Sequence, residues 1–179
     1  TPVPEHPVEL AAATCKAWPY DAGRLLAAAA YSTDGRPAGD RNLQVRVAVL
    51  DARDHRLLAG HAWTEREDAG FALPADGLAL DTARYDLAPG VRAFGVIVGN
   101  GARGPSCPDY RYDRELRLFV VDDGRLRPVL RQHLDAWMRV QGEPCSPSMA
   151  QVVTDDADIT LAMGDQVHAG YRDIGLTAR

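Results

Sequence analysis

The sequence predicts an all-β protein, a single domain of about eight to ten short, mostly antiparallel strands arranged as a sandwich, a barrel or a propeller-like fold. Its 179 residues match the length of one ordinary domain. Apolar and polar residues alternate at period two in many segments, which is the pattern of a strand with one buried face. Turn pairs recur at short intervals, as at Asp34-Gly35, Asp76-Gly77, Pro89-Gly90 and Asn100-Gly101.

The strand pattern is clearest where apolar side chains recur at every second position. Residues 43–50 place Leu43, Val45 and Val47 on one face. Residues 91–98 are apolar on both faces except for Arg92. Residues 134–140 alternate as well and fit either a strand or a short helix. Further strands are predicted at residues 78–80, 115–121, 126–130, 159–163 and 174–178.

The best hairpin joins residues 115–121 to residues 126–130 through the turn Asp122-Asp123-Gly124. Pro128 has no amide hydrogen to donate, so the return strand is expected at a sheet edge or with a bulge. Residues 24–31 resemble residues 56–63, which a repeated hairpin unit would explain.

A second hairpin is expected in residues 81–95, where the Pro89-Gly90 turn separates two strand segments. Four charged side chains lie on its two arms. Arg84 and Arg92 are predicted to pair with Asp81 or Asp86 across this hairpin, which is a structural role.

A helix is predicted at only one place, near the start of the chain. Residues 9–18 are rich in alanine and follow Pro7, a combination that favours at most one short N-terminal helix. Three prolines within the first seven residues disfavour both helix and sheet. Residues 1–9 are therefore expected to be a flexible leader, and residues 10–179 the single β-rich domain.

Charge argues against two classes of partner. The net charge is −5 and no basic run is present, so neither nucleic acid nor an anionic membrane surface is an expected partner. The longest apolar run, residues 25–31, is too short to span a membrane. All but one of the 20 basic residues are arginine, a bias that we attribute to genome composition.

The cysteines indicate the compartment. Cys107 and Cys145 each lie beside proline in a turn-rich segment, which predicts a disulfide between two loops. A structural disulfide requires an oxidising compartment, so the chain is expected to be periplasmic or secreted after removal of a signal peptide. Cys15 is then either free or paired between chains.

No catalytic, cofactor or metal motif is found. Residues 99–104 match the G-x-G-x-x-G dinucleotide pattern, but Pro105 and Pro108 forbid the helix that must follow it. The five histidines lack the spacing of zinc ligands, and none of the four serines lies in a nucleophile elbow. Residues Asp155 to Asp158 are expected to form a solvated turn rather than a calcium loop.

Loop 106–113, with the sequence Ser-Cys-Pro-Asp-Tyr-Arg-Tyr-Asp, is the strongest candidate for a binding site. Two tyrosines around an arginine form a composition that protein interfaces prefer at their centres. A disulfide at Cys107 would hold the loop rigid and lower the entropy lost on binding. The residues expected to contact a partner are Ser106, Asp109, Tyr110, Arg111 and Tyr112, with the last three carrying most of the binding energy.

The spacing of Ser106 and Tyr110 resembles the Ser-Gly-x-x-Tyr loop of bacterial periplasmic lysozyme inhibitors, with Cys107 in place of the glycine. The resemblance covers five residues and implies a loop that plugs an enzyme's cleft. The expected function is therefore an exported, non-enzymatic binding protein, an inhibitor or immunity protein that blocks a lysozyme-like or other cell-wall-degrading enzyme. Its negative charge would steer encounter with a basic partner of that kind.

Two other functions are left open by the sequence. One is a hydrolase that uses loop carboxylates, for example Glu67, Asp68 or Asp81, because sequence spacing does not constrain a glycosidase pair. The other is a carbohydrate-binding module that stacks sugars on Trp18, Trp63 or Trp137. Capture of a stoichiometric protein or of a glycan would distinguish these functions.

Overall fold

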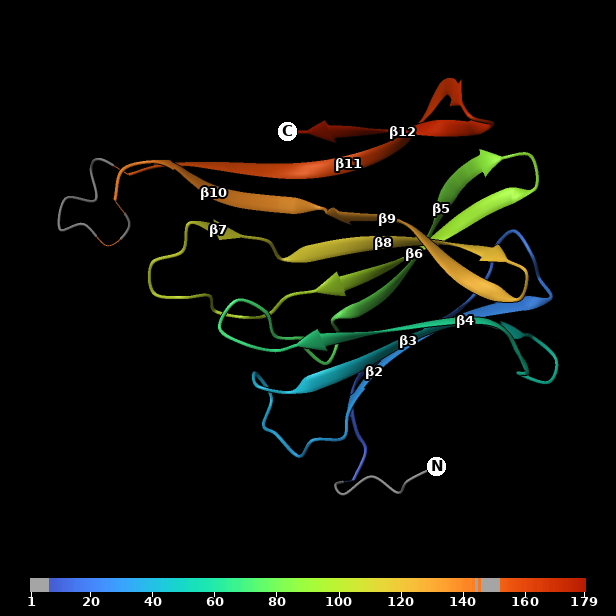
Figure 1. The fold of residues 1–179 in the computed structure, drawn as a ribbon, viewed down its shortest axis with the longest axis horizontal. Coiled ribbons are helices and arrows are strands. Elements are labelled where there is room, and N and C mark those ends of the chain that lie inside the picture. Colours follow the sequence, from blue (N-terminus) through green and yellow to red (C-terminus); the bar gives the residue numbers. More distant parts are fainter. Residues whose placement is uncertain (1–6, 144, 146–151) are drawn as a thin grey trace.

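The computed structural model describes residues 7–143, 145 and 152–179, and throughout these residues the chain forms strands and turns. Within this described part of the chain, twelve antiparallel strands make three sheets of four strands each (Figure 1). The predicted all-β class is confirmed, and the strands outnumber the eight to ten expected from the sequence. Among the described residues, no helix is long and apolar enough to cross a membrane.

Most neighbouring strands in the sheets follow one another in the chain. Sheet A has the order β1 (Glu9–Ala17), β2 (Arg24–Ser32), β3 (Asn42–Asp51) and β4 (Leu57–Arg66). Sheet B has the order β5 (Leu78–Ala88), β6 (Val91–Gly99), β8 (Arg114–Asp122) and β9 (Arg125–His133). Sheet C has the order β12 (Tyr171–Ala178), β11 (Val153–His168), β10 (Asp135–Gln141) and β7 (Tyr110–Arg111). In sheet B, β6 pairs with β8 because β7 belongs to sheet C.

The first hydrophobic core lies between sheets A and B. Every second side chain of β3 points into it, beginning with Leu43, as the alternation in the sequence predicts. Phe94 of β6 and Phe119 of β8 are fully buried there, with ring centroids 6.1 Å apart. Trp18 meets Phe94 edge to face at 5.6 Å. Burial of each such side chain contributes about 1.5–3 kcal/mol to folding.

A second core covers the opposite face of sheet B. Leu116 and Leu118 of β8 are buried in it, and Leu161, Met163 and Ile174 of sheet C pack against them. The molecule therefore has three layers with sheet B in the middle (Figure 1). A middle sheet has two buried faces, and this explains why residues 91–98 are apolar on both sides.

The hairpin between β8 and β9 confirms the predicted turn. Asp122 pairs with Arg125, and the two residues between them have φ angles of 46° at Asp123 and 72° at Gly124. Two positive φ angles define the type I′ turn, whose twist matches that of the strands. The expected edge position and bulge are both confirmed, because β9 ends the order of sheet B and its register shifts opposite Pro128.

The helix predicted at residues 9–18 is wrong, because these residues form strand β1. Alanine favours helices in isolation, but pairing with β2 and burial of Ala12 in the first core decide the conformation. The strand begins at Glu9, within the segment expected to be a leader. Residues 1–6 of that expected leader lie outside the described residues.

The hairpin formed by β5 and β6 carries the ion pairs expected from the sequence. Arg84 and Arg92 both contact Asp86, at N–O distances of 3.5 and 2.5 Å. Asp81 accepts instead a 2.7 Å hydrogen bond from the hydroxyl of Tyr85. Arg84 is mostly exposed whereas Arg92 is largely buried, so the Arg92 pair is the one that braces the hairpin.

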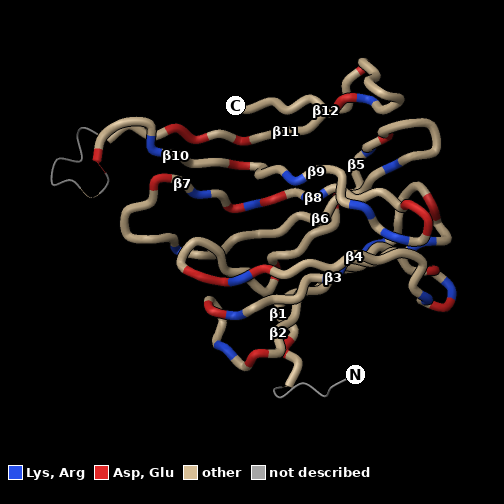
Figure 2. Tube along the Cα trace, viewed as in Figure 1, with Lys and Arg blue, Asp and Glu red and all other residues tan. Residues whose placement is uncertain are grey.

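Two strands of sheet B continue directly into sheet C. Only Leu134 separates β9 from β10, and only Tyr112 and Asp113 separate β7 from β8. Residues 135–140 therefore belong to a strand, the first of the two alternatives predicted for residues 134–140. The hairpin of β10 and β11 extends beyond the sandwich as an arm (Figure 1). Figure 2 shows acidic and basic residues interleaved along the strands in this view.

Candidate functional site

Strand β7 consists of Tyr110 and Arg111 of the predicted binding loop. Three contacts join the loop before β7 to the arm. The predicted disulfide between Cys107 and Cys145 is present, with Cα atoms 5.7 Å apart. Arg139 of β10 donates from its side chain to the carboxylate of Asp109 at 2.8 Å and from its backbone amide to the Asp109 carbonyl at 2.9 Å. Cys15, on β1, is a free and exposed thiol.

The cross-strand register divides the predicted binding residues between two faces of sheet C. Tyr110 pairs with Met138, so these two side chains share one face. Arg111 pairs with Trp137 and lies on the opposite face, because successive side chains in a strand alternate. Asp109 and Ser106 are exposed on the loop that leads into β7. Tyr110 and Arg111 are adjacent in the chain, but their side chains therefore point to different surfaces.

The face with Tyr110 exposes a group of large apolar side chains at the arm. Tyr110 is 44% exposed and its partner Met138 is 42% exposed. Val140 and Val153, at the far end of the same hairpin, are 50% and 47% exposed. We call these four residues the arm surface. Contiguous exposed apolar side chains on a soluble protein mark interaction sites, and tyrosine and methionine are enriched there.

The ring of His133 joins Tyr110 to Tyr112. Tyr112 stacks on the imidazole with centroids 3.8 Å apart, and the Tyr110 hydroxyl lies 2.6 Å from His133 Nδ1. His133 Nε2 lies 3.3 Å from a carboxylate oxygen of Glu115. A carboxylate only accepts, so in neutral His133 we place the proton on Nε2, which leaves Nδ1 to accept from Tyr110. The orientation of both tyrosines is thus fixed from the interior.

Glu115 is the buried anion at the base of this cluster, with a side chain only 3% exposed. Arg117 and Arg131 donate to its two carboxylate oxygens at 2.7 and 2.8 Å. Burial alone would raise the pKa of Glu115, but hydrogen bonds and charge from Arg117 and Arg131 outweigh it and lower the pKa. Burial, followed by the charge of Glu115, raises the pKa of Tyr112, so its hydroxyl stays protonated at neutral pH.

The same ionic cluster extends to a groove between edge strands β4 and β9. Arg117 lies 4.5 Å above the Trp63 ring and also pairs with Glu65. Trp63 stacks on Phe119 with centroids 5.9 Å apart. The groove has a volume of about 320 Å³ and is lined mainly by aromatic and apolar side chains with Arg117 and Arg131. The indole of Trp63 therefore contacts the protein's own side chains and also lines the groove.

Comparisons with protein-family models, curated proteins and solved structures found no match. The function is therefore argued from the geometry of the site.

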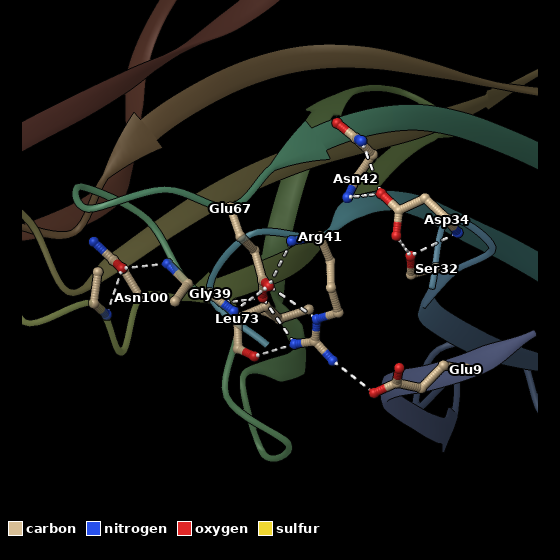
Figure 3. Close-up of polar contacts among 11 residues, drawn as sticks. Glu9, Ser32, Asp34, Gly39, Arg41, Asn42, Glu67, Leu73 and Asn100 are labelled. Atoms are coloured by element: carbon tan, nitrogen blue, oxygen red, sulfur yellow. Dashed lines mark hydrogen bonds and ion pairs between the residues drawn. The ribbon is translucent and has the colours of Figure 1, made fainter. Parts of the chain in front are cut away.

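The carboxylates that suggested a hydrolase are engaged in holding the fold together. Glu67 is fully buried, and its two oxygens accept from the Arg41 guanidinium at 2.8 Å each (Figure 3). The amides of Gly39 and Leu73 donate to the same carboxylate at 2.8 and 3.0 Å. Burial would raise the pKa of Glu67, but these donors lower it. Glu67 is thus an ionised structural group that fixes the chain between β4 and β5.

The other two carboxylates have similar local roles. Asp68 accepts from the amide of Gly70 at 2.7 Å, which closes a turn. Asp81 accepts from the amide of Ala83 and from the hydroxyl of Tyr85. Glu67, Asp68 and Asp81 are each engaged in local hydrogen bonds, so they do not provide a pair of free carboxylates for a hydrolase.

The remaining sequence motifs also have structural positions. Residues 100–109 after β6 form no helix, as expected for the rejected dinucleotide motif. Asn100 anchors this loop, since its side chain contacts the backbone of Gly70, Ala72 and Tyr112 at 2.9–3.1 Å. The segment from Asp155 to Asp158 lies within strand β11 rather than in the expected turn. Among the described residues, no three or more acidic, histidine or cysteine side chains gather as metal ligands.

Several residues of the site lay outside the sequence-based prediction. Met138 and His133 come from β10 and β9, and Glu115 comes from β8. One signal was available for Glu115, because a charged residue at an inward position of an apolar strand requires partners. Nothing in the sequence places His133 beside Tyr110, since 23 residues separate them.

Proposed function

We propose that this protein is an exported, non-enzymatic binding protein that docks a partner protein on its arm surface. The observation that carries the proposal is the exposure of Tyr110 and Met138 as cross-strand neighbours on a disulfide-braced sheet. An inhibitor or immunity protein for a cell-wall-degrading enzyme is the specific form that the sequence suggests, and it stays a prediction.

Rigidity is the first support for this function. Binding costs free energy when side chains and loops must be ordered, so a surface fixed beforehand binds more tightly. Tyr110 is held through His133, and the loop before it is held by the disulfide and by Arg139. These contacts leave the apolar parts of the arm surface exposed while restricting their motion.

Charge and compartment agree with the same function. The net charge of −5 favours encounter with a basic partner, and lysozyme-like enzymes are generally basic. The disulfide is consistent with an oxidising compartment, where such enzymes act.

The test compares capture of partners by the protein and by surface variants. Immobilised protein is exposed to an envelope extract, and any stoichiometric partner is then titrated by calorimetry. We expect Tyr110→Ala and Met138→Ala each to weaken binding by about 1–4 kcal/mol, the range for central interface residues. Melting temperatures should change little, because exposed residues contribute little to the cores.

The matched control is Leu57→Ala. Leu57 is a large apolar residue on β4, 60% exposed and outside the arm surface, so its removal should leave binding unchanged. The proposal is wrong if a partner binds the Tyr110 and Met138 variants as tightly as the original protein. The specific form is tested separately, by the residual activity of purified lysozymes after titration with the protein.

A further inference from the structure

We infer that the opposite face of sheet C, around Trp137, is a binding site for one ring of a neutral oligosaccharide. This site is independent of the proposed protein-binding function, because the arm surface lies on the other face. The site would take a sugar ring against the indole, with its neighbouring hydroxyl groups held by the charged residues on either side.

The register places three chemically different groups in a row across the face. Trp137 of β10 pairs with Arg111 of β7 on one side and with Asp156 of β11 on the other. Asp156 and Leu161 are an odd number of positions apart in β11, so their side chains lie on opposite faces of the sheet. Leu161 packs on the second core, and Asp156 and the rest of the row therefore point away from that core. An indole thus lies between a guanidinium and a carboxylate on an open sheet face.

A hollow of about 160 Å³ lies over this row, and Trp137, Arg111 and Asp156 line it. Its size suits one sugar ring rather than a whole chain. The lining of this hollow is mainly polar, and polar groups placed around the indole can fix a ligand's orientation. The remaining charged side chains that line the hollow are Asp113, Asp135, Asp158 and Arg179.

Trp137 differs from the other two tryptophans in what covers its ring. Trp18 is only 7% exposed and packs on Phe94, and the Trp63 ring contacts Phe119 and Arg117. In the described part of the chain, neither an aromatic ring nor a guanidinium lies over the Trp137 ring. Its indole can therefore stack with a ligand without displacing such a partner.

The charges select the class of ligand. Arg111 disfavours a cation and Asp156 disfavours an anion, whereas a hydroxyl group can accept from the first and donate to the second. Arg114 pairs with both Asp135 and Asp158, at N–O distances of 3.0 and 3.4 Å, and so offsets part of their negative charge. Vicinal hydroxyls of a neutral sugar match both the guanidinium and the carboxylate in this geometry.

Arg111 is also held in place before any ligand arrives. Strand β7 pairs with β10, and the disulfide at Cys107 anchors the chain immediately before it. The carboxylate of Asp113 lies 3.6 Å from the Arg111 guanidinium, which limits its motion further. A preordered guanidinium loses less entropy on binding a weak ligand such as a sugar.

The test is a calorimetric and fluorescence titration of the whole protein with three probes: a cello-oligosaccharide, a chito-oligosaccharide and an oligogalacturonate. We expect at least one of the two neutral probes to bind and to change tryptophan fluorescence. Trp137→Ala should weaken that binding at least tenfold, and Trp137→Phe should weaken it less because a ring is retained. Asp156→Ala should weaken it more than Asp156→Asn, since asparagine keeps an acceptor.

Trp63→Phe is the matched control and should leave affinity unchanged, while melting temperatures confirm that each variant folds. The inference is overturned if neither neutral probe binds, or if Trp137→Ala binds as tightly as the original protein. Binding of the oligogalacturonate alone, weakened by salt, would instead reveal an anion site and would also overturn it. Tyr110→Ala should leave sugar binding intact, which separates this result from the proposed function.

Discussion

A buried polar side chain in this protein stabilises the fold when each of its polar atoms has a hydrogen-bond partner. Glu67 shows this most clearly, because both its oxygens accept from Arg41 and from backbone amides in the interior (Figure 3). Loss of one member of such a pair leaves an uncompensated buried charge, which is far more costly than the loss of a surface pair.

Glu67→Gln tests that role. It leaves the Arg41 guanidinium, only 7% exposed, with the exposed Glu9 carboxylate at 3.3 Å as its remaining negative partner. We expect the free energy of unfolding to fall by about 3–5 kcal/mol, the range for breaking a buried ion pair. Chemical denaturation measures this change. Asp40→Asn removes the partner of Arg36 in an exposed pair and should change stability by less than about 0.5 kcal/mol.

The low pKa values of Glu67 and Glu115 also predict how stability depends on pH. Both groups bind protons more weakly in the folded protein than in the unfolded chain, whose glutamate pKa is near 4.5. Their contribution is therefore complete above that value and is lost as pH falls through the lower folded pKa. Melting temperature should be flat near neutrality and fall below about pH 4.5, and Glu67→Gln should make this fall shallower.

At the scale of elements, strands with clear alternation were predictable and strands of small residues were not. The pattern located β3, β6, β8 and the β8–β9 turn, because burial on one or two faces leaves a period-two trace. Strand β2 was missed, since alanine occupies both its inward positions, such as Ala28, and its outward positions, such as Ala29. Because both faces of β2 carry alanine, its sequence shows no period-two alternation of apolar and polar residues.

The candidate site was predictable only in part, because it depends on the register between strands β7 and β10. Composition pointed to loop 106–113, and its cysteine pointed to the disulfide. The division of Tyr110 and Arg111 between two faces depends on how β7 aligns with β10, where Tyr110 pairs with Met138 and Arg111 with Trp137. No local pattern encodes that alignment.

The disulfide is the element that holds the arm to its neighbouring loop, and thiol titration tests its presence. We expect one reactive thiol, Cys15, in the folded protein and three after reduction and denaturation. The bridge spans a sequence separation of 38 residues, for which loop-closure entropy gives about 2–4 kcal/mol of stability. Three reactive thiols without reduction would contradict the bridge and weaken the case for export.

Cys145→Ser extends this test to binding. Without the bridge, the loop before β7 gains freedom that a partner must remove, so partner affinity should fall. Binding of the Cys145→Ser variant is measured by the same calorimetric titration as that of the arm-surface variants. Cys15→Ser, which removes a thiol that makes no bridge, is the control and should bind as the original protein does.

At the scale of the whole molecule, the layer order explains the distribution of apolar residues. Sheet B is buried on both faces, whereas sheets A and C each cover one core and present their other face to solvent. The sequence predicted strands but not three layers, because the stacking of sheets depends on contacts between distant segments.

Far-UV circular dichroism tests this architecture as a whole. We expect a β-dominated spectrum without the double minimum of a helix, since the described residues contain none. Helix content above about a third, the level of an average domain, would contradict the fold.

The pairing of strands in chain order has a consequence during synthesis. Sheet A is complete at Arg66, but the sheet that covers its inner face is complete only at His133. Ribosomes add about 5–20 residues per second, so Leu26, Val45 and Val47 remain uncovered for several seconds on the emerging chain. During that time the nascent chain presents a hydrophobic surface to other chains. Slower translation would lengthen the time for which this hydrophobic surface is exposed.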